Sequence, residues 1–476
     1  MLKIYNTLSR KKEVFKPLAG KKVGLYTCGP TVYDYDHLGH AWTYIQADIL
    51  RRVLEYYGYK VKHVMNITDV GHLTADADSG EDKMEKSARE KKKSVWEIAE
   101  FFTKIYFENR KKMNLLPPTV VCKATDHIKE MITLLKTLEK NGYTYKIDDG
   151  IYFDVQKFPK YGQLSGNKLK DIKAGARVEV NAQKRHPADF ALWKFTPKGV
   201  KRQMEWDSPW GKGFPGWHIE CSAMSMKYLG KTFDIHTGGE DNIFPHHECE
   251  IAQSESATGK KFVNLWFHSR FLKIEGQKMS KSLKNFFTIA DIEKRGFSAL
   301  SLRYLFLTGH YRSPLNFTWK GLSSAKTALN KLYDITTSLR SGNQRDKSLF
   351  HPSLRSGKGK INNEYKEKFL KSVSDDLNMP KAISVVWQLI KDKKINDADK
   401  RKTLIDFDKV LGLDLFKSKK ITIPSPVKKL VALREKYRRE KNWQKADESR
   451  KEIERTGFSI EDTEKGPKIK KIETAH

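Results

Sequence analysis

Thiol, imidazole and carboxylate side chains occur along this sequence in a combination that suits a metal ion. Cys28 lies near the start of the chain, Cys221 lies far downstream, and His246 and Glu250 follow within one short stretch. Because His246 and Glu250 are four residues apart, they would share one face of a helix. Two thiolates, one imidazole and one carboxylate are all ligands that Zn²⁺ accepts. These four residues therefore make a plausible zinc site.

The spacing alone does not decide between this zinc site and simpler arrangements. It is not the compact pair of Cys-x-x-Cys motifs that is typical of a zinc ribbon. His247 or Cys249 could replace one of the four ligands. Buried free cysteines beside histidines at the start of a helix are the alternative, and without further context they are favoured because both are common.

Two further motifs suit a polyphosphate. His37-Leu38-Gly39-His40 stands where a strand gives way to a helix, and the start of a helix offers unpaired N–H groups to a phosphate. Two imidazoles there could donate hydrogen bonds to phosphate oxygens in a transition state. Lys278-Met279-Ser280-Lys281-Ser282 is a loop that follows a glycine, and its two lysines could clamp a polyphosphate as mobile charges. Either motif alone also fits an ordinary surface segment.

The elements that must position these residues can be predicted from local patterns. Val23–Thr27 is a short apolar run that predicts a buried strand, residues 39–57 have one apolar helical face, and 61–67 predicts a second strand. Strand, helix and strand in this order predict a parallel sheet with a right-handed crossover, whose ligands bind at the carboxyl ends of the strands. Residues 74–93 show no apolar period and predict a surface loop that leads into a helix.

Composition limits the class of protein. The chain has 476 residues, with 90 Lys and Arg against 58 Asp and Glu, which gives a net charge of +32. This charge favours a polyanionic partner such as nucleic acid, although an organism with basic proteins would also produce it. The four cysteines predict a reduced, cytoplasmic protein without a disulfide scaffold. No run approaches the roughly 18–20 apolar residues of a membrane span, so no membrane partner is expected.

Taken together and in order, these motifs resemble the cysteinyl-tRNA synthetases, a family of class I aminoacyl-tRNA synthetases. The resemblance covers most of the chain, and as an ordered set its motifs are highly specific. They are Tyr26–Tyr33, His37–His40, Asn66–Asp69, Asp189–Lys194, Pro215–Ser222, His236–Asp241, Phe244–Glu250, Lys278–Ser282 and Asp375–Pro380.

The resemblance implies a role for each matching residue. Cys28, Cys221, His246 and Glu250 would hold one Zn²⁺. His37, His40, Lys278 and Lys281 would act on the phosphates of ATP, with Gly239 and Asp241 also binding ATP. Gly29, Thr68 and Trp217 would line the amino-acid pocket. Asp447 and Asp462 match positions that read the anticodon, and Trp443 or Tyr437 could stack on anticodon bases, although packing of Trp443 in a core is favoured.

The implied reaction is the ATP- and Mg²⁺-dependent joining of L-cysteine to tRNA-Cys through cysteinyl-adenylate. Zinc would select the cysteine thiolate, no editing domain would be needed, and the protein would act as a monomer. A ligase that joins cysteine to an amino sugar is the nearest alternative, and a non-catalytic zinc protein that binds nucleic acid is the alternative from another class.

The expected fold is α/β, with a Rossmann-like parallel-sheet domain followed by helical tRNA-binding domains. The expected parts are a split catalytic domain (1–120 and 211–310), a connective insertion (121–210), a stem-contact region (311–340), a linker (341–363), a helical tRNA-binding domain (364–420) and an anticodon-binding module (421–476).

Overall fold

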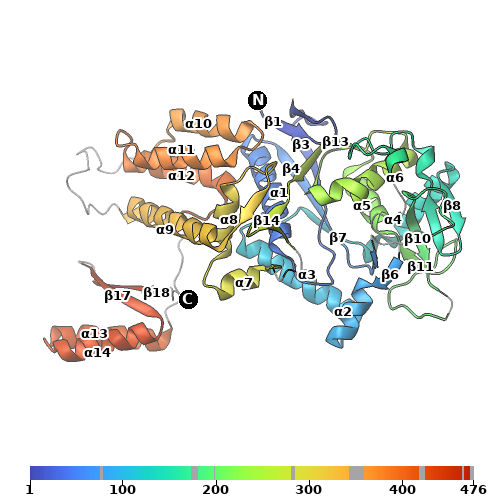
Figure 1. Cartoon of the computed structure of the whole chain (residues 1–476). Coiled ribbons are helices and arrows are strands. Elements are labelled where there is room, and N and C mark those ends of the chain that lie inside the picture. The colour runs from blue at the N-terminus through green and yellow to red at the C-terminus, as the bar shows by residue number, and fades with distance from the viewer. Residues whose placement is uncertain are drawn as a thin grey trace. The chain divides into compact units, whose positions relative to one another are not determined.

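The structure of the chain is a computed structural model (Figure 1). It describes residues 1–75, 79–172, 181–197, 199–279, 283, 285–341, 359–417, 424–463 and 466–471. The chain divides into two compact units, one of Met1–Ile289 with Ala299–Leu415 and the other of Ala290–Ser298 with Phe416–His476. No helix among the described residues is both long and apolar enough to cross a membrane.

A parallel sheet of five strands forms the centre of the larger unit. Its strands in spatial order are β13 (Val263–Ser269), β12 (Phe233–Gly239), β3 (Lys22–Thr27), β4 (Lys60–Ile67) and β7 (Val120–Lys123). The chain runs outward from β3 in one direction through β4 and β7, and in the other through β12 and β13. The strand order therefore reverses at β3, which is the place where open parallel sheets bind ligands.

Helix α1 (Leu38–Tyr56) connects β3 to β4 and confirms the predicted strand–helix–strand unit. Its apolar face is buried, including Trp42, Ile45, Ile49 and Val53. Gly58 follows with a φ of +83°, a conformation that glycine adopts without strain, and this turns the chain into β4. The α/β fold class is as predicted, and the sheet places the ends of its strands beside the start of α1.

The region predicted as an insertion carries a second sheet. Helix α4 (Ile128–Lys140) precedes an antiparallel sheet. The strand order of this sheet is β11 (Gly213–Pro215), β10 (Phe190–Phe195), β9 (Gly150–Phe153) and β8 (Thr144–Ile147). The core of this region is continuous with that of the central sheet, since Phe153 and Leu192 belong to the same buried cluster as Tyr26 and Trp266.

The polar stretch at 74–93 is more ordered than its composition indicated. It contains the hairpin strands β5 (Leu73–Ala75) and β6 (Ser79–Asp82) and the helix α2 (Lys83–Lys91). The Asp82 side chain accepts hydrogen bonds from the N–H groups of Met84 and Glu85, which caps α2. Helix α3 (Val95–Lys112) follows, so the predicted surface loop is short.

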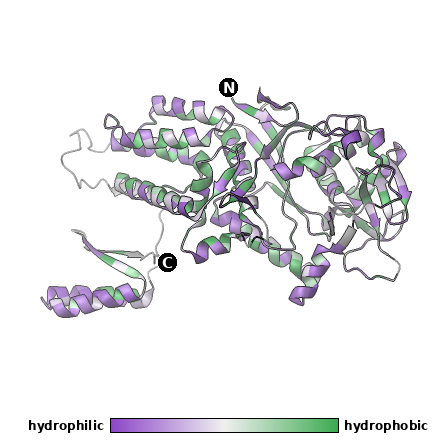
Figure 2. Ribbon diagram, viewed as in Figure 1, coloured by the Kyte–Doolittle hydropathy of each residue, from purple (hydrophilic) through white to green (hydrophobic). Residues whose placement is uncertain are grey.

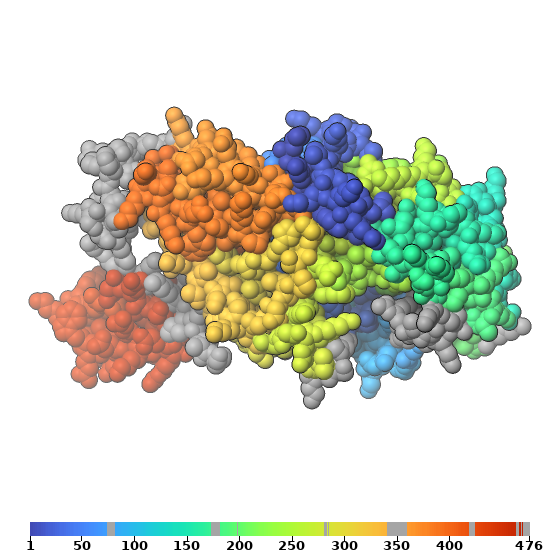
Figure 3. Space-filling view, turned by 45° about the horizontal axis from the view of Figure 1, so that its top comes forward, coloured from blue at the N-terminus to red at the C-terminus, as the bar shows by residue number. Residues whose placement is uncertain are grey.

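Helices pack beside the sheet in the second half of the larger unit, and Figure 3 shows them in yellow and orange next to the blue N-terminal strands. They are α8 (Ala299–Leu307), α9 (Trp319–Ser341), α10 (Asn363–Ser374), α11 (Met379–Lys391) and α12 (Asp397–Leu411). Most of the predicted linker, residues 342–358, lies outside the described residues.

Two buried carboxylates tie these helices to the rest of the larger unit. Asp376 accepts hydrogen bonds from the Tyr5 N–H (2.8 Å) in strand β1 (Lys3–Asn6) and from the Tyr311 hydroxyl (2.5 Å). The Asp48 carboxylate, in α1, accepts hydrogen bonds from Arg52 in the same helix and from Arg303 in α8, each at 2.7 Å. The helical region is therefore bonded to both the first strand and α1.

The smaller unit contains two long helices and a two-stranded antiparallel sheet: α13 (Ser425–Arg439), α14 (Trp443–Arg455), β17 (Phe458–Thr463) and β18 (Gly466–Lys471). Its core is small and comprises Val427, Val431, Ile453, Phe458 and Ile460. Figure 2 shows that the two helices are mostly hydrophilic, as expected for a module with so few buried positions.

Candidate active site at the carboxyl edge of the sheet

Several predicted site residues stand where the parallel strands end. Cys28 directly follows β3, Thr68 directly follows β4, and Gly239 is the last residue of β12. Because β3 lies between the other two, these residues meet at one edge of the sheet. Helix α5 (Trp217–Leu229) and helix α6 (Glu248–Thr258) bring the remaining members to this edge.

The four predicted zinc ligands come together. The candidate ligand atoms of Cys28, Cys221, His246 and Glu250 all lie within 4.8 Å of one another. The two sulfur atoms are 3.8 Å apart, and Nε2 of His246 is 3.2 Å from Oε1 of Glu250. Cys221, His246 and Glu250 are buried, whereas Cys28 is only partly buried. We call these four residues the thiol–histidine cluster.

The cluster is electrostatically coupled. Burial alone would lower the pKa of His246, but its contacts with Cys221 and Glu250 raise that pKa to about 10. Burial acts to raise the pKa of Glu250, but His236 and His246 lower it to about 2. The hydrogen bond with Cys28 lowers the pKa of Cys221, while burial raises that of Cys28. Charged ligand groups are thus held close together in a desolvated place.

Further histidines surround the cluster and orient its members. Nδ1 of His246 lies 2.9 Å from Nδ1 of His218, so its other nitrogen faces Glu250. His236 contacts the second oxygen of Glu250 at 2.9 Å. A partner for the second nitrogen of a metal-binding imidazole is a usual feature of metal sites, because it fixes the ring.

The alternative ligand His247 is also near. Its Nε2 is 3.3 Å from the Cys28 sulfur, and Cys28, His236, His247 and Glu250 form a second possible ligand group. Nδ1 of His247 contacts His268 at 2.7 Å. The other alternative, Cys249, contacts the Tyr161 hydroxyl at 3.4 Å and belongs to neither group.

The residues predicted to line an amino-acid pocket adjoin the cluster. The Gly29 N–H donates to the Asn66 side chain at 2.7 Å, and a Cβ on Gly29 would lie 1.7 Å from the Asn66 carbonyl oxygen, so only glycine fits there. The Asn66 amide donates to the Thr68 hydroxyl at 3.1 Å. Trp217, at the start of α5, has its ring centroid 4.6 Å from that of His246.

The histidine motif begins α1. The His37 side chain accepts a hydrogen bond from the His40 N–H at 3.2 Å, and the two imidazole rings stack with centroids 3.8 Å apart. Burial would lower the pKa of His40, but Asp36, whose carboxylate lies 3.4 Å away, raises it. A more basic imidazole at the positive end of a helix suits an anionic ligand.

The segment around the lysine loop pairs with the histidine motif. His37 and Thr288 form an antiparallel bridge, and the Leu38 N–H donates to the Phe287 carbonyl at 2.9 Å. Lys278 ends β15 (Gln277–Lys278) and is exposed. Lys281 lies outside the described residues. At the end of β12, Asp241 is exposed, and its carboxylate approaches so closely that a Cβ on Gly239 would lie 2.3 Å from it.

The predicted anticodon residues belong to the smaller unit. Asp447 is exposed, and Asp462 accepts hydrogen bonds from both Arg434 and Arg438. The Arg434 hydrogen bond lowers the pKa of Asp462 to about 2. The prediction that Trp443 packs in a core is wrong. The Trp443 side chain is 60% exposed at the first position of α14, because the small core is filled by other residues.

Sequence reasoning gave no role to several buried residues at this edge. His72 and Glu220 pair at 2.5 Å although they are 148 positions apart, and His236 faces Glu250 from inside a strand. His236 and Glu220 lie in motifs that carry the resemblance, but no local spacing shows which buried groups they meet.

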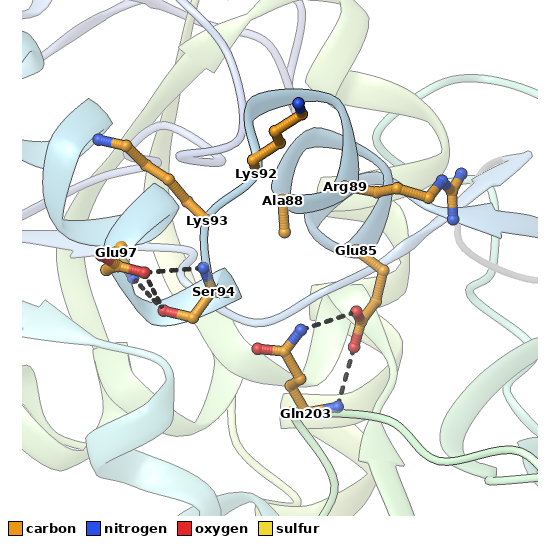
Figure 4. Close-up of a pocket in the computed structure, with 8 residues that line it drawn as sticks. All are labelled: Glu85, Ala88, Arg89, Lys92, Lys93, Ser94, Glu97 and Gln203. Carbon is orange, nitrogen blue, oxygen red and sulfur yellow. Dashed lines mark hydrogen bonds between the residues drawn. The ribbon is translucent and has the colours of Figure 1, made fainter.

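A polar pocket away from the carboxyl edge of the sheet is lined by none of the predicted site residues. It lies at α2 and α3, has a volume of about 450 Å³, and is shown in Figure 4. Glu85, Ala88, Arg89, Lys92, Lys93, Ser94, Glu97 and Gln203 line it. Its cations and carboxylates are mixed, and the Glu85 carboxylate already accepts hydrogen bonds from Gln203.

Comparison with known proteins gives consistent results. Residues 14–327 match the family model of the class I (C) tRNA synthetase catalytic domain. The chain is 47% identical to the cysteine–tRNA ligase of Treponema denticola, with 97% of this chain and 98% of the relative aligned. It is 42% identical to that of Thermococcus gammatolerans over 99% of both chains.

Among solved structures, a methionyl-tRNA synthetase of Mycobacterium tuberculosis in complex with methionyl-adenylate aligns with a TM-score of 0.54. It covers 83% of this chain and 90% of its own at 14% identity. At that identity the likeness concerns the fold alone.

Proposed function

The chain belongs to the cysteine–tRNA ligase family of class I aminoacyl-tRNA synthetases, and we propose that its thiol–histidine cluster holds a zinc ion that selects the substrate. Members of this family join L-cysteine to tRNA with ATP. The cysteine carboxylate attacks the α-phosphorus, which gives cysteinyl-adenylate and releases pyrophosphate. A ribose hydroxyl of the tRNA then takes the cysteinyl group and releases AMP. The observation that carries the zinc proposal is the convergence of Cys28, Cys221, His246 and Glu250.

The geometry of the cluster supports zinc. Zinc binds sulfur at about 2.3 Å and nitrogen or oxygen at about 2.0–2.2 Å, so tetrahedral sites place two sulfurs about 3.8 Å apart and two lighter ligands about 3.3–3.5 Å apart. The two sulfur atoms of Cys28 and Cys221 are 3.8 Å apart, and the His246–Glu250 distance is 3.2 Å. Thiolate and imidazole ligands also favour zinc over magnesium or calcium.

The residues around the cluster would present cysteine to it. When bound, the zinc ion would supply a direct bond to the substrate sulfur, which separates cysteine from serine by softness rather than by shape. Shape alone would separate such similar side chains by about 10–200-fold. Gly29 lets the backbone beside Cys28 pass close to the Asn66 carbonyl, because a Cβ there would overlap that carbonyl. Thr68 and Trp217 would line the pocket and hold the amino acid.

The α1 terminus and the lysine loop would bind ATP with its Mg²⁺. His37 and His40 stand at the positive end of α1, where N–H groups and imidazoles can stabilise charge on the phosphates. Lys278 and Lys281 would neutralise the leaving pyrophosphate. Gly239 and Asp241, at the end of β12, would bind the nucleoside, with Asp241 on the ribose. The reaction then depends mainly on positioning and charge.

The helical half would bind the tRNA, which we assign as tRNA-Cys. We assign residues 311–340 to the stem and 364–420 and 421–476 to further tRNA contacts, with Asp447 and Asp462 at the anticodon. The exposed Trp443 ring supports stacking on an unpaired base. The net charge of +32 supports contacts with phosphates. We further assign the protein to the cytoplasm, where its four free thiols stay reduced, and expect a monomer.

The decisive experiment compares two buried cysteines. Cys221→Ala should lose zinc, measured by metal analysis, and should lose cysteine-dependent ATP–pyrophosphate exchange. Cys249→Ala removes an equally buried thiol outside the cluster, so it should keep both. Serine-dependent exchange by the wild-type protein should stay at background. If Cys221→Ala keeps its zinc and still prefers cysteine over serine, the proposal is wrong.

A further inference from the structure

A buried hydrogen-bond chain ends beside the amino-acid pocket. Nε2 of His72 lies 2.5 Å from Oε1 of Glu220, and the Thr68 hydroxyl donates to Oε2 of Glu220 at 2.8 Å. At its other end, Asn66 joins Thr68 to the Gly29 N–H. Glu220 is fully buried, and His72 and Thr68 are 3% and 2% exposed, so water does not compete for these contacts.

The direction of each hydrogen bond from Gly29 to Glu220 is fixed by the Gly29 N–H. The Gly29 N–H can only donate, so the Asn66 oxygen faces it and the Asn66 amide nitrogen faces Thr68. The Thr68 oxygen therefore accepts from Asn66 and gives its own proton to Glu220. A hydroxyl has one proton and two lone pairs. One lone pair of Thr68 is left, and it can accept one more hydrogen bond.

His72 holds the other end of this chain. Among the described residues its Nε2 is the group that occupies Oε1 of Glu220. Nδ1 of His72 is buried and has no hydrogen-bond partner, which costs free energy that an apolar side chain of similar size would not cost. The contact with Glu220 therefore explains why a histidine, rather than an apolar residue, occupies position 72.

The backbone at His72 is anchored from several sides. The His72 carbonyl accepts from the Lys83 N–H at 3.0 Å. Asp82 packs so tightly on Gly71 that a Cβ there would lie 2.2 Å from the carboxylate, and Arg202 bonds the same carboxylate from the inserted region. The backbone that carries the imidazole is therefore held by the start of α2 and by Asp82, which Arg202 bonds in turn.

We infer that His72 is a positioning residue: it holds the Glu220 carboxylate where that carboxylate takes the Thr68 proton, so that the Thr68 oxygen stays aimed as an acceptor for the α-ammonium group of the substrate. This rests on the proposed function, in which Thr68 lines the cysteine pocket. The remaining lone pair of Thr68 suits an ammonium donor, while a carboxylate, which only accepts, would find no donor there. The Thr68 hydroxyl would thus bind the α-ammonium group of cysteine, while the zinc ion of the thiol–histidine cluster would bind its sulfur.

Two fragments of cysteine test this separately. Cysteamine has the thiol and the ammonium group, and 3-mercaptopropionate has the thiol and the carboxylate. The affinities are measured by calorimetric titration of the zinc-loaded protein. His72→Leu should weaken the binding of cysteamine by about tenfold or more, because the loss of one hydrogen bond to a charged group reduces affinity by about this factor. The affinity of the same variant for 3-mercaptopropionate should change by less than about twofold. His72→Gln keeps a donor that can reach Glu220 and should largely restore cysteamine binding.

The controls separate this role from general damage. His127 is another buried histidine, bonded to Tyr228, so His127→Leu should leave both affinities unchanged. The zinc content of each variant should stay at one per chain. If His72→Leu does not fold, His72→Asn, which is too short to reach Glu220, replaces it in the comparison with His72→Gln. Equal weakening of both fragments, or no weakening of cysteamine, overturns the inference. Should the wild-type protein bind neither thiol, the zinc proposal itself fails instead.

Discussion

Replacing Asp48 by asparagine should destabilise the larger unit strongly at neutral pH. The Asp48 carboxylate accepts hydrogen bonds from Arg52 and Arg303, and the Arg303 side chain has no exposed area. Asp48→Asn has nearly the same shape but leaves two buried guanidinium groups without a counter-charge. Breaking a buried pair in this way costs about 3–5 kcal/mol of the free energy of unfolding.

The pH dependence of this loss follows from the pKa of Asp48. Burial would raise that pKa, but Arg303, Arg52 and the Leu116 N–H lower it from 3.8 to about 2. A lowered carboxyl pKa stabilises the folded state above the unfolded value, and this stabilisation is lost as the pH falls from about 4 through about 2. A shift of nearly two units corresponds to about 2–3 kcal/mol.

Urea unfolding of wild-type protein and Asp48→Asn between pH 2 and 7 measures this difference. The gap should be widest above pH 4 and should shrink by about 2–3 kcal/mol toward pH 2. Glu55→Gln is the matched control, because Glu55 lies in the same helix but in a partly exposed pair with Arg51, and should cost less than about 0.5 kcal/mol. A gap below about 1 kcal/mol at pH 7, or one that does not narrow in acid, would refute the reasoning.

Three further changes test other parts of the site. Gly29→Ala should abolish ATP–pyrophosphate exchange because its Cβ would overlap the Asn66 carbonyl, whereas Gly24→Ala, whose Cβ would make contacts of 3.4 Å or more, should retain it. Lys278→Ala should slow adenylate formation at saturating cysteine by about 10²-fold, as loss of one transition-state contact does, and an unchanged rate would remove Lys278 from the mechanism. Trp443→Ala should raise the KM for tRNA about tenfold, in line with one lost stacking contact, and should leave tRNA-independent exchange intact; equal loss of both would contradict a role in tRNA binding.

The parts of the fold that local patterns determine could be predicted from the sequence. The apolar run before Cys28 and the helical period after Gly39 give β3 and α1 because these elements depend on neighbouring residues. The thiol–histidine cluster could be named only through the ordered motifs, since Cys28 and Cys221 meet across almost half the chain. The His72–Glu220 pair has no local signal at all, because a histidine in a polar stretch looks exposed. The expectation that Trp443 is buried is wrong because it rests on the usual burial of aromatic side chains, while the smaller unit has only a small core.

Helix α1 joins two distant parts of the larger unit in one rigid element. Its first turn carries His37 and His40, while Asp48, Arg52 and Tyr56 farther along are bonded to α8 and α12. At 1.5 Å per residue the helix is about 28 Å long, and beyond Gly39 in its first turn it has no glycine or proline where it could bend. If tRNA docks on the helices α8 to α12 as proposed, a shift of these helices would be transmitted along α1 as a tilt of the whole helix. The end of α1 that we propose binds the nucleotide is thus joined through one helix to the region that we propose binds the tRNA.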